Sequence, residues 1–161
     1  MLAAQPFTDE HCTEVLELFA DPDFHYRGEA HPEFLAEAEV LALLDKDTFV
    51  LLRQDSMIGL YAAEPVGGEH AGHWELHLRL RSDADQLLWL TAYKQAIEAL
   101  RYRTGIVRIT VRVGEYDTTG RRAALEAGMQ PEGTLTEVVR HDGEHVGICH
   151  FSLIWPPEEA S

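Results

Sequence analysis

The segment spanning residues 106–154 constrains the fold more than any other part of this chain. It begins with RITVRV, in which polar and apolar residues alternate as they do in a half-buried β-strand. It continues with EYDTTGRRAALEAGM, where Asp117 can cap a short helix and Gly128 can end it in a left-handed conformation. Two β-prone stretches follow, joined by Asp142-Gly143, a dipeptide typical of tight hairpin turns. The segment therefore predicts a strand, a helix and a hairpin.

The rest of the chain predicts further strands and helices. In chain order, these are a strand at 2–7, helices at 8–20 and 32–44, strands at 48–53, 57–63 and 73–80, and a helix at 86–102. The complete order is β-αα-ββ-β-α-β-α-ββ, which places the chain in the α/β (α+β) class. Because no linker, repeat or low-complexity segment interrupts this order, we expect one domain over residues 1–161.

Apolar spacing predicts which helix faces are buried. In the first helix the expected stripe, with a core thiol at its start, is Cys12, Val15, Leu16 and Phe19. In the second it is Phe34, Leu35, Ala38, Leu41 and Leu44. In the long helix it is Trp89, Tyr93, Ala96, Ile97 and Leu100, and either Asp83 or Asp85 is expected to cap that helix.

The net charge of −15 narrows the range of partners. Phosphate binding needs clusters of Lys and Arg, so we expect no nucleic-acid partner. An acidic field attracts amines and basic peptides, although it can equally serve solubility alone. The N-terminus lacks the basic and apolar regions of a signal peptide, and no apolar run reaches membrane-spanning length. We therefore expect a cytoplasmic protein without a membrane partner.

The C-terminal segment resembles the GCN5-related N-acetyltransferase (GNAT) superfamily. Gly128-Met129 and Glu132-Gly133 stand where that superfamily has Gly-Phe and Glu-Gly after its fourth helix. Residues 132–153 are most similar to the branch of ribosomal-protein alanine acetyltransferases, which has the same Glu-Gly, a comparable turn and a Ser-Leu ending. The order of elements is also that of the superfamily. The resemblance implies a mixed central sheet of about seven strands with about four helices, and transfer of an acyl group from acetyl-CoA to an amine.

The resemblance also implies a coenzyme A site at the start of the 86–102 helix, and there the chain departs from the family. Relatives cradle the pyrophosphate with an Arg/Gln-x-x-Gly-x-Gly/Ala loop, whose glycines let backbone N–H groups approach the anion. Residues 73–104 contain no glycine, and Asp83 and Asp85 place carboxylates where the pyrophosphate would lie. Asp85 and Gln86 are the expected contacts at this degenerate loop, with the carboxylates either excluding the cofactor or serving as ordinary caps.

Other cofactor contacts are expected along the strand before that helix. The pantetheine arm would use backbone groups at about residues 77–80, which adds Leu78, Arg79 and Leu80. Arg79 and Arg81 either clamp phosphate or neutralise the neighbouring aspartates. In the fourth helix, Asp117 occupies the family's usual Asn position, and Ala124 occupies the position of its Tyr general acid.

The catalytic candidates are Glu75 and His77, because a Glu on this strand often acts as the base in relatives. Both belong to a polar face that alternates with the apolar residues of strand 73–80. A neutral histidine is suited to accept a proton near pH 7. The same face could instead make ordinary hydrogen bonds. The spacing His73-x-Glu75-x-His77 could also serve a metal, although we assign no metal site.

Three functions remain open at this point. The first is an acyl-CoA-dependent N-acyltransferase that acts on an amine of a small molecule or peptide. The second is a catalytically inactive GNAT-like domain that has lost coenzyme A and binds a ligand or partner. The third is a metal-dependent enzyme. A homodimer formed through C-terminal strands, as in some relatives, is a further expectation.

Overall fold

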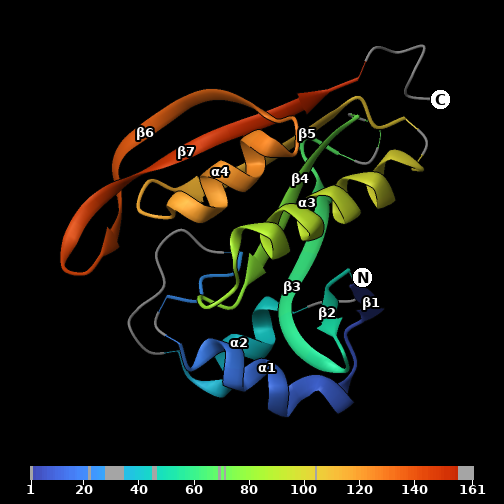
Figure 1. The fold of residues 1–161 in the computed structure, drawn as a ribbon, viewed down its shortest axis with the longest axis vertical. Coiled ribbons are helices and arrows are strands. Elements are labelled where there is room, and N and C mark those ends of the chain that lie inside the picture. The colour runs from blue at the N-terminus through green and yellow to red at the C-terminus, as the bar shows by residue number, and fades with distance from the viewer. Residues whose placement is uncertain are drawn as a thin grey trace. The chain divides into compact units, whose positions relative to one another are not determined.

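The computed structural model describes residues 2–155, except for residues 22, 28–34, 45–46, 69, 71 and 104. Within these residues the chain forms seven strands, four α-helices and one short 3-10 helix in the predicted order (Figure 1). The elements are β1 (Ala3–Pro6), η1 (Asp9–His11), α1 (Cys12–Phe19), α2 (Glu37–Leu43), β2 (Phe49–Arg53), β3 (Ser56–Pro65), β4 (His73–Leu80), α3 (Gln86–Arg101), β5 (Arg108–Gly114), α4 (Thr118–Glu126), β6 (Gln130–His141) and β7 (Glu144–Ile154).

The strands form one mixed sheet with the hydrogen-bonding order β1-β2-β3-β4-β5-β7-β6. β4 and β5 run parallel, whereas β1–β2, β2–β3, β5–β7 and β6–β7 pair antiparallel. The chain divides into two compact units. The first unit comprises Met1–Ala62 and His77–Ala84, and the second comprises Ala63–Leu76 and Asp85–Ser161.

The core of the first unit lies between its two helices and strands β2 and β3. Its buried members are Val15, Leu18, Phe24, Tyr26, Val40, Leu44, Val50, Met57, Leu60 and Ala62. Within this core region the hydroxyls of Tyr26 and Thr48 lie 3.0 Å apart and share a hydrogen bond. Pairing satisfies two hydroxyl groups that would otherwise be costly to bury.

The buried faces of α1 and α2 agree in part with the predicted stripes, since Val15 and Leu44 are buried and four other predicted members pack against the core, namely Leu16, Phe19, Leu35 and Leu41. In α1 the buried residues are Val15 and Leu18, whereas Cys12 is only half-buried because it lies at the first residue of the helix. In α2 the buried residue is Val40, and Ala38 is exposed. Both helices are short, so a small rotation about the axis is enough to exchange neighbouring positions on the stripe. Phe34 lies outside the described residues.

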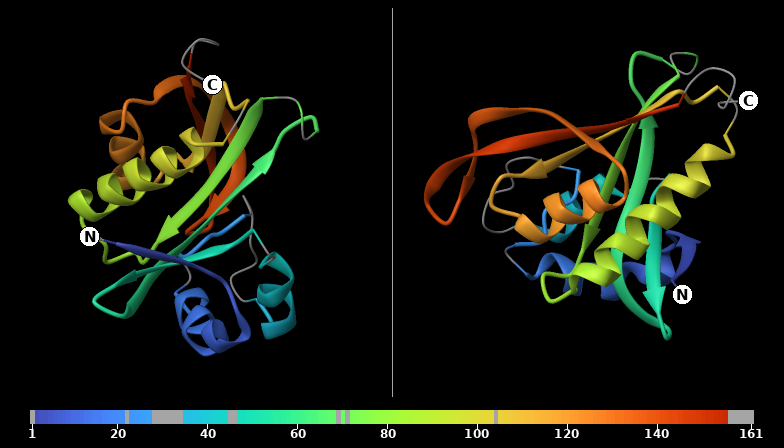
Figure 2. Two further views of the ribbon diagram at one scale, coloured as in Figure 1. Left: turned by 90° about the vertical axis from the view of Figure 1, so that its right-hand side faces the viewer. Right: turned by 45° about the horizontal axis from the view of Figure 1, so that its top comes forward.

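In the second unit, α3 and α4 lie side by side (Figure 2). The predicted stripe of α3 is confirmed, since Trp89, Tyr93, Ala96, Ile97 and Leu100 are all buried. No helix among the described residues combines the length and apolarity that crossing a membrane requires.

In the second unit, two helices and one hairpin end at the glycine and turn residues that the sequence predicts. Gly128 has a φ of 96° after α4, and Gly105 has a φ of 85° after α3. The turn between β6 and β7 is formed by Asp142 and Gly143, with φ values of 49° and 80°. Two successive positive φ values match the right-handed twist of a hairpin, which favours glycine at the second position.

Candidate functional site

Polar side chains from four neighbouring strands of the second unit make three sets of hydrogen bonds and ion pairs. We call these side chains the polar cluster. Its members are His73 and Glu75 from β4, Arg108, Thr110 and Arg112 from β5, Glu132 from β6 and Ser152 from β7. The residues of β5 reach it because they alternate with Ile109, Val111 and Val113, which are buried. Strand periodicity therefore separates a polar face from the core.

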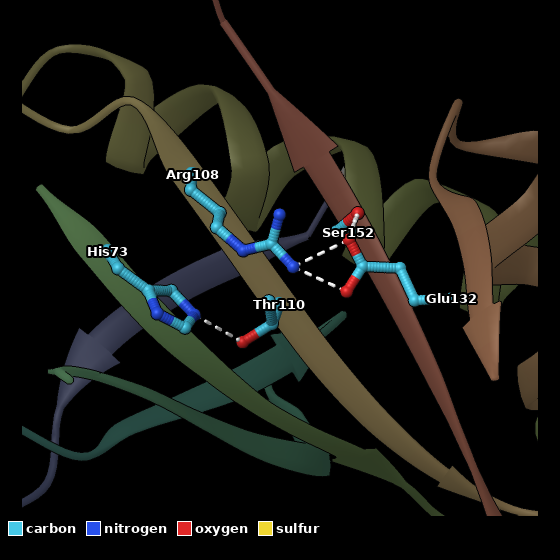
Figure 3. Close-up of polar contacts among 5 residues, drawn as sticks. All are labelled: His73, Arg108, Thr110, Glu132 and Ser152. Atoms are coloured by element: carbon cyan, nitrogen blue, oxygen red, sulfur yellow. Dashed lines mark hydrogen bonds and ion pairs between the residues drawn. The ribbon is translucent and has the colours of Figure 1, made fainter. Parts of the chain in front are cut away.

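Glu132 links three strands within the polar cluster (Figure 3). One of its carboxylate oxygens lies 2.5 Å from Nη2 of Arg108 and 2.5 Å from the hydroxyl of Ser152, both of which donate to it. Its other oxygen accepts a second bond from Arg108. The hydrogen bond from Arg108, followed by the one from Ser152, lowers the pKa of Glu132. This carboxylate is therefore ionised at neutral pH.

The β4 side chains of the polar cluster are engaged by β5. Nε2 of His73 lies 2.9 Å from the hydroxyl of Thr110, as Figure 3 shows. Burial, and then the charge of Arg108, lower the pKa of His73, so that its imidazole is neutral at pH 7. Glu75 forms an ion pair with Arg112. His73 and Glu75 thus each contact a side chain of β5.

Glu75 and His77, the predicted catalytic residues, differ in what surrounds them. The carboxylate of Glu75 accepts a hydrogen bond from Nε of Arg112. Burial lowers the pKa of Arg112, although a guanidinium remains charged at neutral pH. His77 is half-buried on β4. Neither residue is identified as a base by its geometry alone, and both roles remain predictions.

The charged side chains just before α3 form hydrogen bonds with groups close to them in the sequence. Arg81 donates two bonds to the carboxylate of Asp83, with N–O distances of 3.1 and 3.0 Å. Asp85 is the cap of α3, and its carboxylate accepts from the backbone N–H of Leu88 at 2.8 Å. A carboxylate thus occupies the N-terminal end of α3, where the resemblance predicted the pyrophosphate site. Of the two roles predicted for Arg81, this geometry favours neutralisation of an aspartate.

The remaining predicted cofactor residues are distributed around this segment. Nη2 of Arg79 donates to the backbone carbonyl of Asp23 at 2.8 Å. Leu80 is buried and Leu78 is half-buried. Gln86 contacts α4; in the orientation that satisfies both of its amide atoms, it bridges the backbone of that helix at 3.2 and 3.0 Å. Through side chains, therefore, these residues mainly bind other parts of the protein.

The parallel pairing of β4 with β5 is short. His73–Glu75 are in register with Arg108–Thr110, and the register ends there. β4 continues to Leu80, while β5 continues to Gly114 in register with β7. Among the described residues, Leu76–Leu80 of β4 are therefore outside the stretch that is in register with β5.

Comparison with solved structures gives the fold. Spermidine N-acetyltransferase from Vibrio cholerae, in complex with CoA and spermine, matches with a TM-score of 0.79 and 14% identity over 99% of this chain and 97% of that chain. A ribosomal-protein-alanine N-acetyltransferase from Brucella melitensis matches with a TM-score of 0.75 and 16% identity, covering 95% of this chain and 99% of that chain. The chain has the GNAT fold. A GNAT-family acetyltransferase from Bacillus anthracis also matches, with a TM-score of 0.77 and 16% identity over 95% of this chain and 94% of that chain.

The sequence itself is distant from known families. No protein-family model matches it, and no curated protein matches it either. The resemblance read from the C-terminal residues is confirmed at the level of fold, and the solved structures that match include ribosomal-protein alanine acetyltransferases. At such low identity, likeness establishes the GNAT fold and leaves the reaction to be argued from the residues of this chain.

The fourth helix of this GNAT fold departs from the family in its side chains. Asp117 caps α4 by accepting from the N–H of Gly120 at 2.9 Å. Ala124, at the family's Tyr position, is fully buried. Tyr116 stacks on His141 with ring centroids 3.7 Å apart and planes inclined by 3°. The neighbouring tyrosine is therefore packed against the end of β6.

Most members of the polar cluster were not among the site residues predicted from the sequence. Arg108, Thr110 and Arg112 alternate with apolar residues in RITVRV, and this alternation could have indicated a polar face. Glu132 was noticed only as part of the Glu-Gly motif, and Ser152 only as part of the Ser-Leu ending. Their hydrogen bond joins residues that are far apart in sequence and meet only after β6 and β7 have paired.

Proposed function

We propose that this protein is an N-acyltransferase that moves an acyl group, most simply acetyl, from coenzyme A to an amine of a small molecule or peptide. The GNAT fold over 95–99% of the chain supports this reaction class. The observation that carries the proposal is the early end of the β4–β5 register. The register ends at Glu75, and we infer that the pantetheine amides hydrogen-bond to the backbone of β4 beyond it, from Leu76 to Leu80.

The proposed chemistry is direct transfer. The amine nitrogen attacks the thioester carbonyl, the new C–N bond forms, the C–S bond breaks, and coenzyme A leaves as a thiolate. A cationic amine loses two protons in all. It gives up the first before it attacks, for which His77 is the first candidate and Glu75 the second, because the latter carboxylate is held in an ion pair with Arg112. The second leaves the nitrogen for solvent as the amide forms. With alanine at position 124 and Tyr116 stacked on His141, the thiolate takes its proton from solvent.

The acceptor is expected to be cationic before it reacts. The net charge of −15 creates a negative field that draws amines toward the protein. The spermidine enzyme with the same fold was solved with spermine, a polyamine, which agrees with this class of acceptor. We therefore propose small-molecule amines and peptide amines as the acceptors to be screened first.

A second candidate function is a GNAT-fold module that no longer binds coenzyme A. The observation that favours it is the segment before α3, where Asp85 occupies the helix end and Arg81 is held by Asp83. A pyrophosphate entering this segment would meet two carboxylates and no glycine. If this function is correct, the domain binds a ligand or partner through other surfaces.

Thermal unfolding with acetyl-CoA separates the two functions. A ligand that binds only the native state must raise the melting temperature, and a concentration one hundred times the dissociation constant contributes roughly 2.7 kcal/mol. A transferase shows a saturable shift and then releases coenzyme A when an amine is supplied. No shift at millimolar acetyl-CoA would exclude the transferase and leave the binding module.

A further inference from the structure

A pocket in the second unit is lined by none of the residues discussed above as candidates for chemistry. It has a volume of about 530 Å³ and opens between the C-terminal half of α3, the end of α4 and the end of β7. Its size falls within the range of roughly 300–1,000 Å³ that is usual for small-molecule sites. The proposed acyl transfer gives this pocket no role.

The floor of the pocket is apolar and contains a broad aromatic surface. Ile97 and Trp155 are buried and line it together with Leu153. The guanidinium of Arg101 lies 5.9 Å from the ring centroid of Trp155. A cation held against one aromatic ring is well placed to contact a second flat ring in the pocket, since guanidinium groups stack on aromatic faces.

The rim of the pocket carries two cations. Lys94 and Arg101 are separated by two turns of α3, about 10 Å along the axis, and therefore project from the same side of the helix. Glu98 lies between them on the rim. Among the described residues, Lys94 and Glu98 form no hydrogen bond or ion pair, so both are available to a ligand.

These charges are unusual for this chain. The protein has 28 acidic residues against 13 basic ones, and it carries a net charge of −15. Two cations at one pocket are therefore a local exception to a field that repels anions. With Glu98, the net charge of the three rim side chains is a single positive charge, which suits one carboxylate better than the several negative charges of a nucleotide.

We propose that this pocket binds a small aromatic carboxylate. Its ring lies on the floor formed by Ile97, Leu153 and Trp155, and its carboxylate is held between Lys94 and Arg101. Glu98 accepts a hydrogen bond from a donor group on the ligand where one is present. The proposal assigns a binding site and requires no covalent step.

The test uses 2-naphthoate as the probe and the full chain as the protein. Isothermal titration calorimetry measures its affinity, with 2-naphthamide as the neutral control of the same shape. We expect saturable binding of the carboxylate and affinity about tenfold lower for the amide, because a charge-assisted bond is lost. Absence of binding at millimolar 2-naphthoate, or equal affinity for the two probes, would overturn the proposal.

Matched variants locate the site. Lys94→Gln and Arg101→Gln should each weaken 2-naphthoate binding about tenfold. Arg53→Gln makes the same charge change at an exposed position of β2 and should leave affinity unchanged. Equal losses in all three variants would show that the change in net charge alone weakens binding of the anionic probe, which refutes the pocket. No acyl donor is present, so the result is independent of the outcome with acetyl-CoA.

Discussion

Replacing Glu132 with alanine tests whether the polar cluster stabilises the C-terminal strands. The hydroxyl of Ser152 is on a residue only 3% exposed and donates to Glu132 at 2.5 Å. A hydrogen bond to a charged group contributes about 1.5–3 kcal/mol, and its loss leaves a buried hydroxyl without an acceptor. The pair with Arg108 is more exposed, with side-chain exposures of 29% and 36%, and contributes about 0.2–1 kcal/mol. Because the carboxylate is itself partly hydrated, we expect a total loss of about 2 kcal/mol at pH 7.

The stabilisation by Glu132 must weaken as the pH falls. Hydrogen bonds lower the pKa of Glu132 in the folded protein. Its contribution is therefore complete above the unfolded-state pKa, about 4.3, and is lost as pH falls through the lower folded-state pKa. Urea denaturation of wild type and Glu132→Ala should consequently show a difference in unfolding free energy that is constant from pH 6 to pH 8 and shrinks below about pH 4.

A matched control separates this effect from loss of any surface carboxylate. Glu126 is 37% exposed and pairs with Arg122 on the same helix at 3.0 Å. Glu126→Ala removes the same charge and should cost less than about 0.5 kcal/mol. A loss below 0.5 kcal/mol for Glu132→Ala at pH 7, or one that persists unchanged to pH 3, would refute the reasoning.

Three other substitutions test the remaining contacts. Asp85→Ala should destabilise the protein by about 1 kcal/mol in urea denaturation, because the first turn of α3 loses its cap. Calorimetry should nevertheless show tighter acetyl-CoA binding by this variant. Weaker binding would mean that the carboxylate of Asp85 does not compete with the pyrophosphate. Gly120→Ala should lower the free energy of unfolding by about 1 kcal/mol in the same assay, since a Cβ there would lie 2.5 Å from Oδ2 of Asp117 and displace the α4 cap. An unchanged denaturation midpoint would contradict this. If His77 is the base, His77→Gln should lower kcat for acyl transfer about a hundredfold with little change in melting temperature, and retained activity would remove it from the proposal.

Features that depend on a few neighbouring residues could be predicted from the sequence. Asp117 caps α4 through Gly120, three residues away, and Asp142-Gly143 forms the hairpin turn, so the signal and the structure lie in the same short segment. The sequence left Asp83 and Asp85 as alternative caps of α3. The geometry assigns the cap to Asp85 and pairs Asp83 with Arg81.

Features that depend on tertiary packing could not be predicted in the same way. The burial of Leu18 and Val40 depends on how each short helix is rotated against its strands, which apolar spacing alone does not determine. The contact between Arg108 and Glu132 joins residues separated by 24 positions and requires the register of two antiparallel pairs. A one-residue slip in either pair would turn one of the two side chains to the opposite face.

The short β4–β5 register has a consequence for hydrogen exchange. Amide protons of a strand exchange slowly where a neighbouring strand holds them, and faster where the only protection comes from one side. On β4, His73–Glu75 are held by β5 and should exchange slowly, so the amides from Leu76 to Leu80 are the ones to compare with them. A pantetheine arm bound along Leu76–Leu80 would slow the same amides. Exchange measured by mass spectrometry would then report occupancy of this stretch by acyl-CoA even in a protein that never forms a product.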